Sequence, residues 1–167
     1  MATHRHVTPR IGAQAIGETS TTARHPLGTT VLARDVTDNG GEGDFTYVLA
    51  SSSVAQYDAV AIKGGHTIGQ LTITNGKLAV EIGFAQIANG TKDTYMWVQR
   101  GGRPIVKLAL ATQAAVPLFA SATGGVLTSV STSVMIQGVV AITEATNSAN
   151  AKTCVSRYPT ALTDTFG

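Results

Sequence analysis

"IGFAQIANGTKDTYMWVQR", residues 82–100, has the outline of a β-hairpin, and "QGVVAITEATNSANAKTCVSR", residues 137–157, repeats that outline. Each stretch has a glycine, a short apolar run, a polar turn, a second alternating run and a Val-x-Arg ending. Alternation of apolar and polar residues is typical of a half-buried β-strand. We therefore interpret the two stretches as two copies of one hairpin.

A similar segment precedes each copy. "YDAVAIKGG" (residues 57–65) comes before the first hairpin and "AVPLFASATGG" (residues 115–125) before the second, and both end in a Gly-Gly pair that marks a turn. The repeated unit is therefore a strand, a turn and a hairpin. Two such units can bury a shared core by closing on each other as two sheets or as a pseudo-symmetric barrel.

The rest of the body also reads as short strands separated by glycine turns, which predicts an all-β sandwich or barrel. Asn75-Gly76 lies between two alternating runs and predicts a further hairpin, with the strand at Leu71 and Ile73 pairing with the strand that follows the turn. Helix has no convincing candidate longer than two turns, and residues 107–116 are the best of them.

Composition restricts the class of protein. Of the 167 residues, 43% are hydrophobic and 13% are charged, so the chain has enough apolar surface for a folded core and predicts one soluble domain. A single cysteine rules out an internal disulfide framework. Neither a secretory signal nor an apolar run of about 20 residues is found, which predicts synthesis in the cytoplasm and no membrane partner. The net charge of +2 is too small to indicate nucleic-acid binding.

The first 30 residues differ from the body. They show no helical or strand periodicity and contain Pro9 and Pro26. Residues 1–34 contain four arginines and a single acidic residue, Glu18, whereas acidic residues slightly outnumber basic ones in the rest of the chain. We predict an extended basic arm over residues 1–30 and a β domain over residues 31–167. The candidate binding residues of the arm and its junction are Arg5, Arg10, Arg24 and Arg34.

Candidate catalytic and metal-binding residues are sparse. His4, His6 and His25 have no thiol or acidic partner nearby, and we interpret them as solvated or partner-contacting. His66 sits at a turn and is expected to be exposed. The best candidate for a cation site is the acidic loop formed by Asp35, Asp38, Glu42 and Asp44. It does not have EF-hand spacing, and we expect it to be solvated without a bound cation.

Nothing in the chain indicates an enzyme. It has no Gly-x-Ser-x-Gly elbow, no phosphate-binding Gly-x-x-x-x-Gly-Lys loop and no evident carboxylate pair. Cys154 aligns with Trp97 when the two hairpins are superposed, and we interpret both as core positions in strands of one type. The sequence therefore predicts a protein without catalytic residues, cofactor or bound metal.

The segment "RHPLGTTVLARDVTDNGGEGDFTYVLASSSVAQYDAVAI" resembles the opening of small head proteins of tailed phages. In those proteins a Leu-Gly-Thr strand leads into a Gly-Glu-Gly-acidic-Phe-x-Tyr segment. "EIGFAQIA", "YMWVQRGG" and "GVVAITEA" resemble later segments of the same proteins, so the similarity covers about residues 24–157. Gln56-Tyr57-Asp58 departs from the Gly-Asp expected there. The family is that of capsid decoration, or cement, proteins.

The resemblance implies a β-sandwich or a barrel-like, β-tulip-like domain with an N-terminal arm. It implies attachment outside a phage capsid, where the protein would bridge subunits of the major capsid protein and stabilise the head. It also implies a homo-oligomer, with a trimer favoured over a dimer. The arm would then grip the coat, so that deletion of residues 1–22 should leave a folded body that no longer binds capsids. The alternative is a receptor- or glycan-binding β module of a phage tail or surface assembly.

Overall fold

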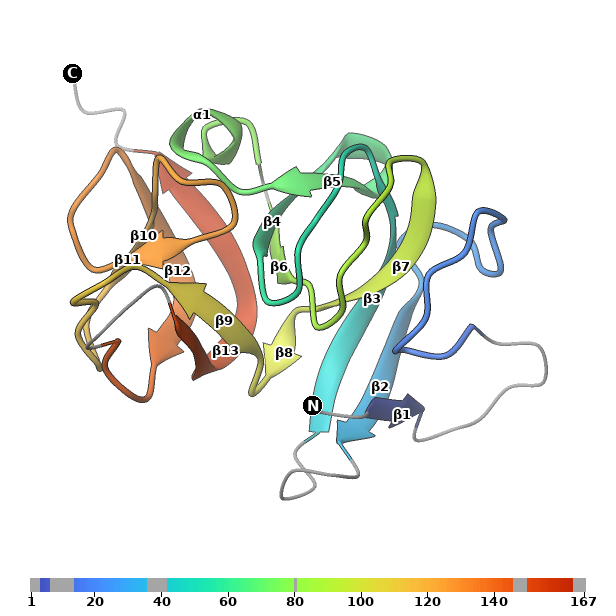
Figure 1. Cartoon of the computed structure of the whole chain (residues 1–167), viewed down its shortest axis with the longest axis horizontal. Coiled ribbons are helices and arrows are strands. Elements are labelled where there is room, and N and C mark those ends of the chain that lie inside the picture. The colour runs from blue at the N-terminus through green and yellow to red at the C-terminus, as the bar shows by residue number, and fades with distance from the viewer. Residues whose placement is uncertain (1–3, 7–13, 36–41, 80, 146–149, 164–167) are drawn as a thin grey trace.

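The computed structural model describes residues 4–6, 14–35, 42–79, 81–145 and 150–163, and it shows an all-β protein made of two similar five-stranded barrels side by side (Figure 1). In Figure 1 the first barrel lies to the right and the second to the left. Across these described ranges, helices that could cross a lipid bilayer are absent. The predicted all-β class and the duplication are both confirmed.

The first barrel is a closed, mixed sheet. The five strands of the barrel are β3 (Glu42–Ala50), β4 (Ala59–Lys63), β5 (Thr67–Gln70), β6 (Glu81–Phe84) and β7 (Thr94–Gln99). Strand β3 pairs in parallel with β5 and antiparallel with β7, while β4 lies between β5 and β6, and β6 closes onto β7. Two further strands, β1 (His4–His6) and β2 (Thr30–Asp35), extend the sheet outward from β3.

The second barrel repeats every pairing of the first. Its five strands are β9 (Ile105–Leu108), β10 (Leu118–Ala120), β11 (Leu127–Thr128), β12 (Val134–Ala141) and β13 (Asn150–Thr163). Strand β9 pairs in parallel with β11 and antiparallel with β13, β10 lies between β11 and β12, and β12 closes onto β13. The two-residue strand β8 (Gly101–Gly102) adds to β13. The repeated unit is therefore five strands, which is longer than the strand, turn and hairpin predicted from the sequence.

Apolar side chains fill both barrels and the space between them. Val48, Met96 and Val98 belong to the cluster inside the first barrel. A larger cluster fills the second barrel and continues onto the outward faces of β4 and β6, where it includes Ile82 and Phe84. One barrel therefore covers an apolar face of the other, and the two are packed as one body.

The hairpin predicted at Asn75-Gly76 is wrong. Residues Ile73–Gly76 form a single helical turn, α1, in which the Thr72 side chain accepts a hydrogen bond from the backbone N–H of Asn75. The Asn75 side chain also donates to the carbonyl of Gln70. These local bonds compete with a two-residue turn, and the flanking strands β5 and β6 both pair with β4 instead of with each other. The weak helix candidate at residues 107–116 forms the end of β9 and turns.

Trp97 and Cys154 are both buried, as predicted, but they face different ways. Cys154 points into the second barrel, whereas Trp97 joins a cluster on the outside of the first barrel. The alignment of the two hairpins is therefore offset by one residue at this strand. Because side chains alternate along a strand, an offset of one residue exchanges the inner and outer faces.

Candidate functional site

Residues 14–29, part of the predicted arm, pack on the outer face of β3 and β7. The Tyr47 hydroxyl donates to Oε1 of Gln14 at 2.6 Å, and the Trp97 indole N–H donates to the Gln14 carbonyl at 3.1 Å. Ser20 forms an isolated β-bridge with Tyr95, and Ile16 is buried in the same cluster. This segment therefore covers the aromatic outer face of the first barrel.

His25 is held inside this aromatic cluster. Its ring meets Tyr47 edge-on at 5.1 Å between centroids and lies 5.2 Å from the Trp97 ring. Its Nε2 accepts a hydrogen bond from the backbone N–H of Gln14. His25 is therefore partly buried by aromatic contacts and is not a fully solvated side chain, while its expected contact with a partner stays a prediction. His66, expected to be exposed, is half-buried and lies against Gly28.

The candidate arginines that the structure describes do not gather at one point. Arg5 in β1 lies directly opposite Arg34 in β2, at the outer edge of the first sheet. Arg24 is exposed in the covering segment, where its backbone N–H donates to the Tyr47 hydroxyl. Arg10 lies outside the described residues. Of the three arginines that the structure describes, Arg5 and Arg34 lie opposite each other and Arg24 lies elsewhere.

The acidic loop is described only in part, because Asp38 lies outside the described residues. Asp35 ends β2, while Glu42 and Asp44 lie on β3. Among the residues that the structure covers, no group of three His, Cys, Asp or Glu side chains is placed to hold a metal ion. Glu42 and Asp44 instead line a cleft.

This cleft has a volume of about 550 Å³ and lies where β3, β8 and β13 meet. Its charged and aromatic lining includes Glu42, Asp44, Arg103, Arg157 and Tyr158. Both signs of charge are present, and the backbone of β8 supplies a glycine wall. Such a lining fits a polar or extended ligand better than a strongly charged one.

Tyr158 is the exposed aromatic ring of the cleft, with 52% of its surface accessible. Its hydroxyl hydrogen-bonds to Asp44, and the Arg100 guanidinium lies 5.3 Å from its ring centroid. Partial burial, and then the neighbouring Asp44 carboxylate, raise the pKa of Tyr158. Arg100 in turn forms an ion pair with Glu81 at 3.2 Å. The Tyr158 ring of the second barrel is thus held by Asp44 of the first barrel and by Arg100, which directly follows β7.

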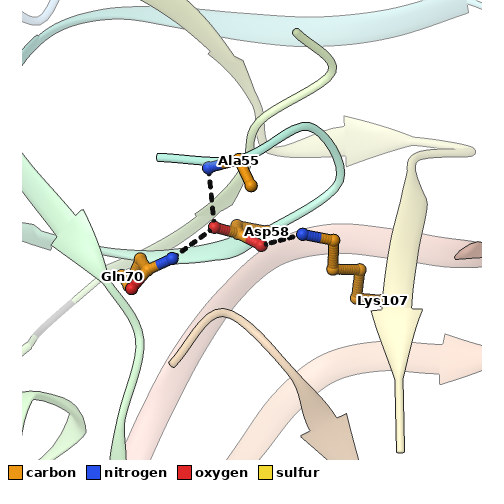
Figure 2. A network of polar contacts seen from close by, with 4 residues as sticks. All are labelled: Ala55, Asp58, Gln70 and Lys107. Atoms are coloured by element: carbon orange, nitrogen blue, oxygen red, sulfur yellow. Dashed lines mark hydrogen bonds and ion pairs between the residues drawn. The ribbon is translucent and has the colours of Figure 1, made fainter. Parts of the chain in front are cut away.

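A buried ion pair joins the two barrels (Figure 2). Asp58 precedes β4 and accepts from the Lys107 ammonium of β9 at 2.6 Å, from the Ala55 N–H at 2.8 Å and from the Gln70 side chain at 2.7 Å. Gly125, with φ of 76°, packs so closely that a Cβ there would overlap the Asp58 carboxyl. Three donors occupy both carboxylate oxygens, which fits a structural role. The only signal in the sequence is an acid at the start of the apolar run 57–62.

Cys154 is fully buried in β13, and burial raises the pKa of its thiol to about 12. The thiolate is the nucleophilic form of cysteine, so this side chain is chemically inert at neutral pH. The interpretation of Cys154 as a small core residue is confirmed.

The chain matches no protein-family model, and no curated protein or solved structure shows significant similarity to it.

Proposed function

We propose that this protein is a capsid decoration protein, which binds the outer surface of a phage head and stabilises it by bridging subunits of the major capsid protein. The sequence resemblance motivates this proposal. The rigid double barrel suits a protein whose task is to bind and brace, and the chemistry proposed for it is non-enzymatic, without cofactor or metal. Its location would be the exterior of the virion.

The observation that carries the proposal is the arrangement of β1 and β2. They place Arg5 opposite Arg34 at the outer edge of the first sheet. Guanidinium groups bind carboxylates through paired hydrogen bonds. A coat surface rich in Asp and Glu would therefore be a suitable partner for this edge. Among the described strands β1 pairs with β2 alone, so its other edge offers backbone groups for pairing with a partner.

Truncation of the chain before Gln14 tests the proposal. The resulting protein keeps Gln14 and Ile16, and so keeps the cover over Trp97, whereas deletion of residues 1–22 would remove both of these buried contacts. We expect the shorter deletion to leave circular dichroism and Trp97 emission unchanged and to abolish binding to capsids that lack the protein. Undiminished capsid occupancy would refute the role of the arm.

A charge-reversal variant adds a matched comparison. We expect Arg5→Glu combined with Arg34→Glu to weaken capsid binding and to reduce its dependence on salt. Lys92→Glu, at an exposed position with 75% of its side chain accessible, should leave binding unchanged. Equal binding by both variants would contradict electrostatic recognition at the β1 edge.

The cleft favours a second candidate, a glycan-binding module. Ligand pockets combine aromatic side chains with a few polar groups that orient the ligand, and Tyr158 beside Asp44 has this arrangement in the cleft. Tyr47 and Trp97 are buried, so neither ring is accessible for binding a sugar. Binding to a glycan array that is lost in Tyr158→Ala would support this candidate, as would a few copies per particle instead of hundreds.

A further inference from the structure

The cleft between the two barrels separates charge by sign. Its acidic side chains, Glu42 and Asp44, lie on β3 of the first barrel, and we call them the acidic wall. Its basic side chains form the basic wall, with Arg157 on β13 and Arg103 between β8 and β9. The ion pairs that form among the described residues involve other side chains, so neither wall neutralises the other. Such a cleft is complementary to a partner that carries both signs of charge.

The floor of the cleft is backbone, because β8 consists of Gly101 and Gly102 alone. Gly102 has φ of 90°, and a Cβ there would overlap the Glu42 carbonyl. A Cβ at Gly101 would meet the Asp44 carboxyl, while on the other side Gly101 pairs with Arg157. The two glycines therefore let the walls approach each other without a side chain of β8 filling the space between them.

Tyr158 is held in an unusual backbone conformation between the walls. Its φ is 47°, in the left-handed region that bulky residues rarely adopt. Its backbone N–H donates to the Arg100 carbonyl at 3.1 Å and its hydroxyl hydrogen-bonds to Asp44, yet its ring stays about half exposed. Strained residues of this kind cluster at functional sites. Tyrosine and arginine are also the side chains that most often dominate the binding energy of protein interfaces.

The acidic wall continues into the β1 edge that is proposed to bind the coat. Residues directly opposite each other on paired strands face the same way. Glu42 lies opposite the exposed Arg34, which is paired in turn with Arg5, and Asp44 lies opposite Leu32, which is 43% exposed. Strand β8 lies beside β3 on the side away from β2 (Figure 1). The cleft and the side chains of Arg34 and Leu32 therefore belong to one continuous surface.

We propose that the cleft binds a segment of the major capsid protein in which a basic and an acidic side chain lie close together. The basic side chain binds the acidic wall, and the acidic side chain binds the guanidinium groups of Arg103 and Arg157, which hold carboxylates through paired hydrogen bonds. The acidic wall repels a segment that carries acids alone. This inference rests on the proposed function and adds to it the chemistry of the coat segment, which the β1 edge does not define.

Reversal of each wall in turn tests the proposal, with binding of the full chain to capsids that lack the protein as the readout. We expect Glu42→Lys to weaken binding by about tenfold or more, because it repels the basic side chain of the segment. Arg103→Glu combined with Arg157→Glu should do the same by repelling the acidic one. The matched controls are Lys77→Glu and Glu144→Lys, at exposed positions outside the cleft, and they should leave binding unchanged.

Neutral variants cover the case in which a reversed charge disturbs folding. Glu42→Gln and Arg157→Gln remove one charge each and add no new one. Each should weaken capsid binding by less than the reversal of its wall does, while circular dichroism and Trp97 emission stay those of the wild type.

Tighter binding after either reversal would overturn the proposal, because it would mean that the segment carries charge of one sign. Unchanged binding by all cleft variants would also overturn it. If truncation before Gln14 still abolished binding in that case, the proposed function would stand with its contact confined to the arm. A wild type that does not bind capsids would overturn both. Glycan binding that the cleft variants lose while they keep capsid binding would assign the cleft to the second candidate function instead.

Discussion

The ammonium of Lys107 lies 2.6 Å from Oδ1 of Asp58, so a cation of the second barrel binds a carboxylate buried in the first. Asp58 is 1% exposed, while the Lys107 side chain keeps 29% of its surface accessible. A buried carboxylate without a partner is strongly unfavourable. The pair therefore helps to fix how the two barrels sit against each other.

Removal of the cation should destabilise the protein. We expect Lys107→Met to lower the free energy of unfolding by about 3 kcal/mol, the lower end for a broken buried pair, because Lys107 is partly solvated. Urea denaturation measures the change. Lys92→Met breaks an exposed ion pair with Asp93 at 3.9 Å and should change stability by less than about 0.5 kcal/mol. Equal effects of the two substitutions would show that Asp58 does not need Lys107.

The cover over Trp97 depends on Gln14, whose side chain accepts from Tyr47 and donates to the carbonyls of Glu18 and Tyr95. We expect Gln14→Ala to cost about 1–3 kcal/mol, because the buried Tyr47 hydroxyl loses its acceptor. Trp97 is the only tryptophan, so its emission should shift to the red as solvent reaches it.

The matched control for this substitution is Gln113→Ala, at an exposed position in the second barrel. It should leave both the stability and the emission spectrum unchanged. If Gln14→Ala behaved in the same way, residues 14–29 would not be a structural cover.

Cys154 gives a pH dependence with a defined sign. Its pKa is about 12 in the folded protein and 9.0 in an unperturbed thiol, because burial disfavours the thiolate. Above pH 9 the unfolded chain releases this proton while the folded chain keeps it. The contribution of the protonated Cys154 thiol to the free energy of unfolding is thus fully present below pH 9. It is lost at about 1.4 kcal/mol per pH unit as pH rises towards 12.

Comparison with Cys154→Ala isolates this effect from other groups that titrate at alkaline pH. The stability of the wild type relative to the variant should fall between pH 8 and pH 11, as measured by urea denaturation at each pH. A difference that stays constant across this range would mean that the thiol titrates equally in both states.

Much of the fold could be predicted because the duplicated elements carry strong local signals. The Gly-Gly turns at Gly64 and Gly124 and the alternating runs around them are local features, and they predict strands correctly. The hairpin at Asn75 failed because a side-chain cap from Thr72 and pairing with β4 outweigh the preference of an Asn-Gly turn. Such competition depends on contacts that are remote in the sequence.

The candidate sites were harder to predict, because they depend on which face a side chain occupies. His25 and Trp97 meet across 72 residues, and Asp58 finds its cation 49 residues away. The outward apolar residues Val140 and Val155 look in the sequence like core positions, since alternation alone does not distinguish inside from outside when both faces are apolar. The closure of the second barrel is what places them on its surface.

The strand-pairing scheme shared by the two barrels also determines the order in which the barrels can fold during synthesis. All five strands of the first barrel lie before residue 100, so that barrel has its complete set of partners before β9 has left the ribosome. The second barrel needs its last strand, β13, which is made at the end. During synthesis the first barrel therefore contains Asp58 without its ion-pair partner until Lys107 is added. The apolar outer faces of β4 and β6 stay exposed to solvent until the second barrel covers them.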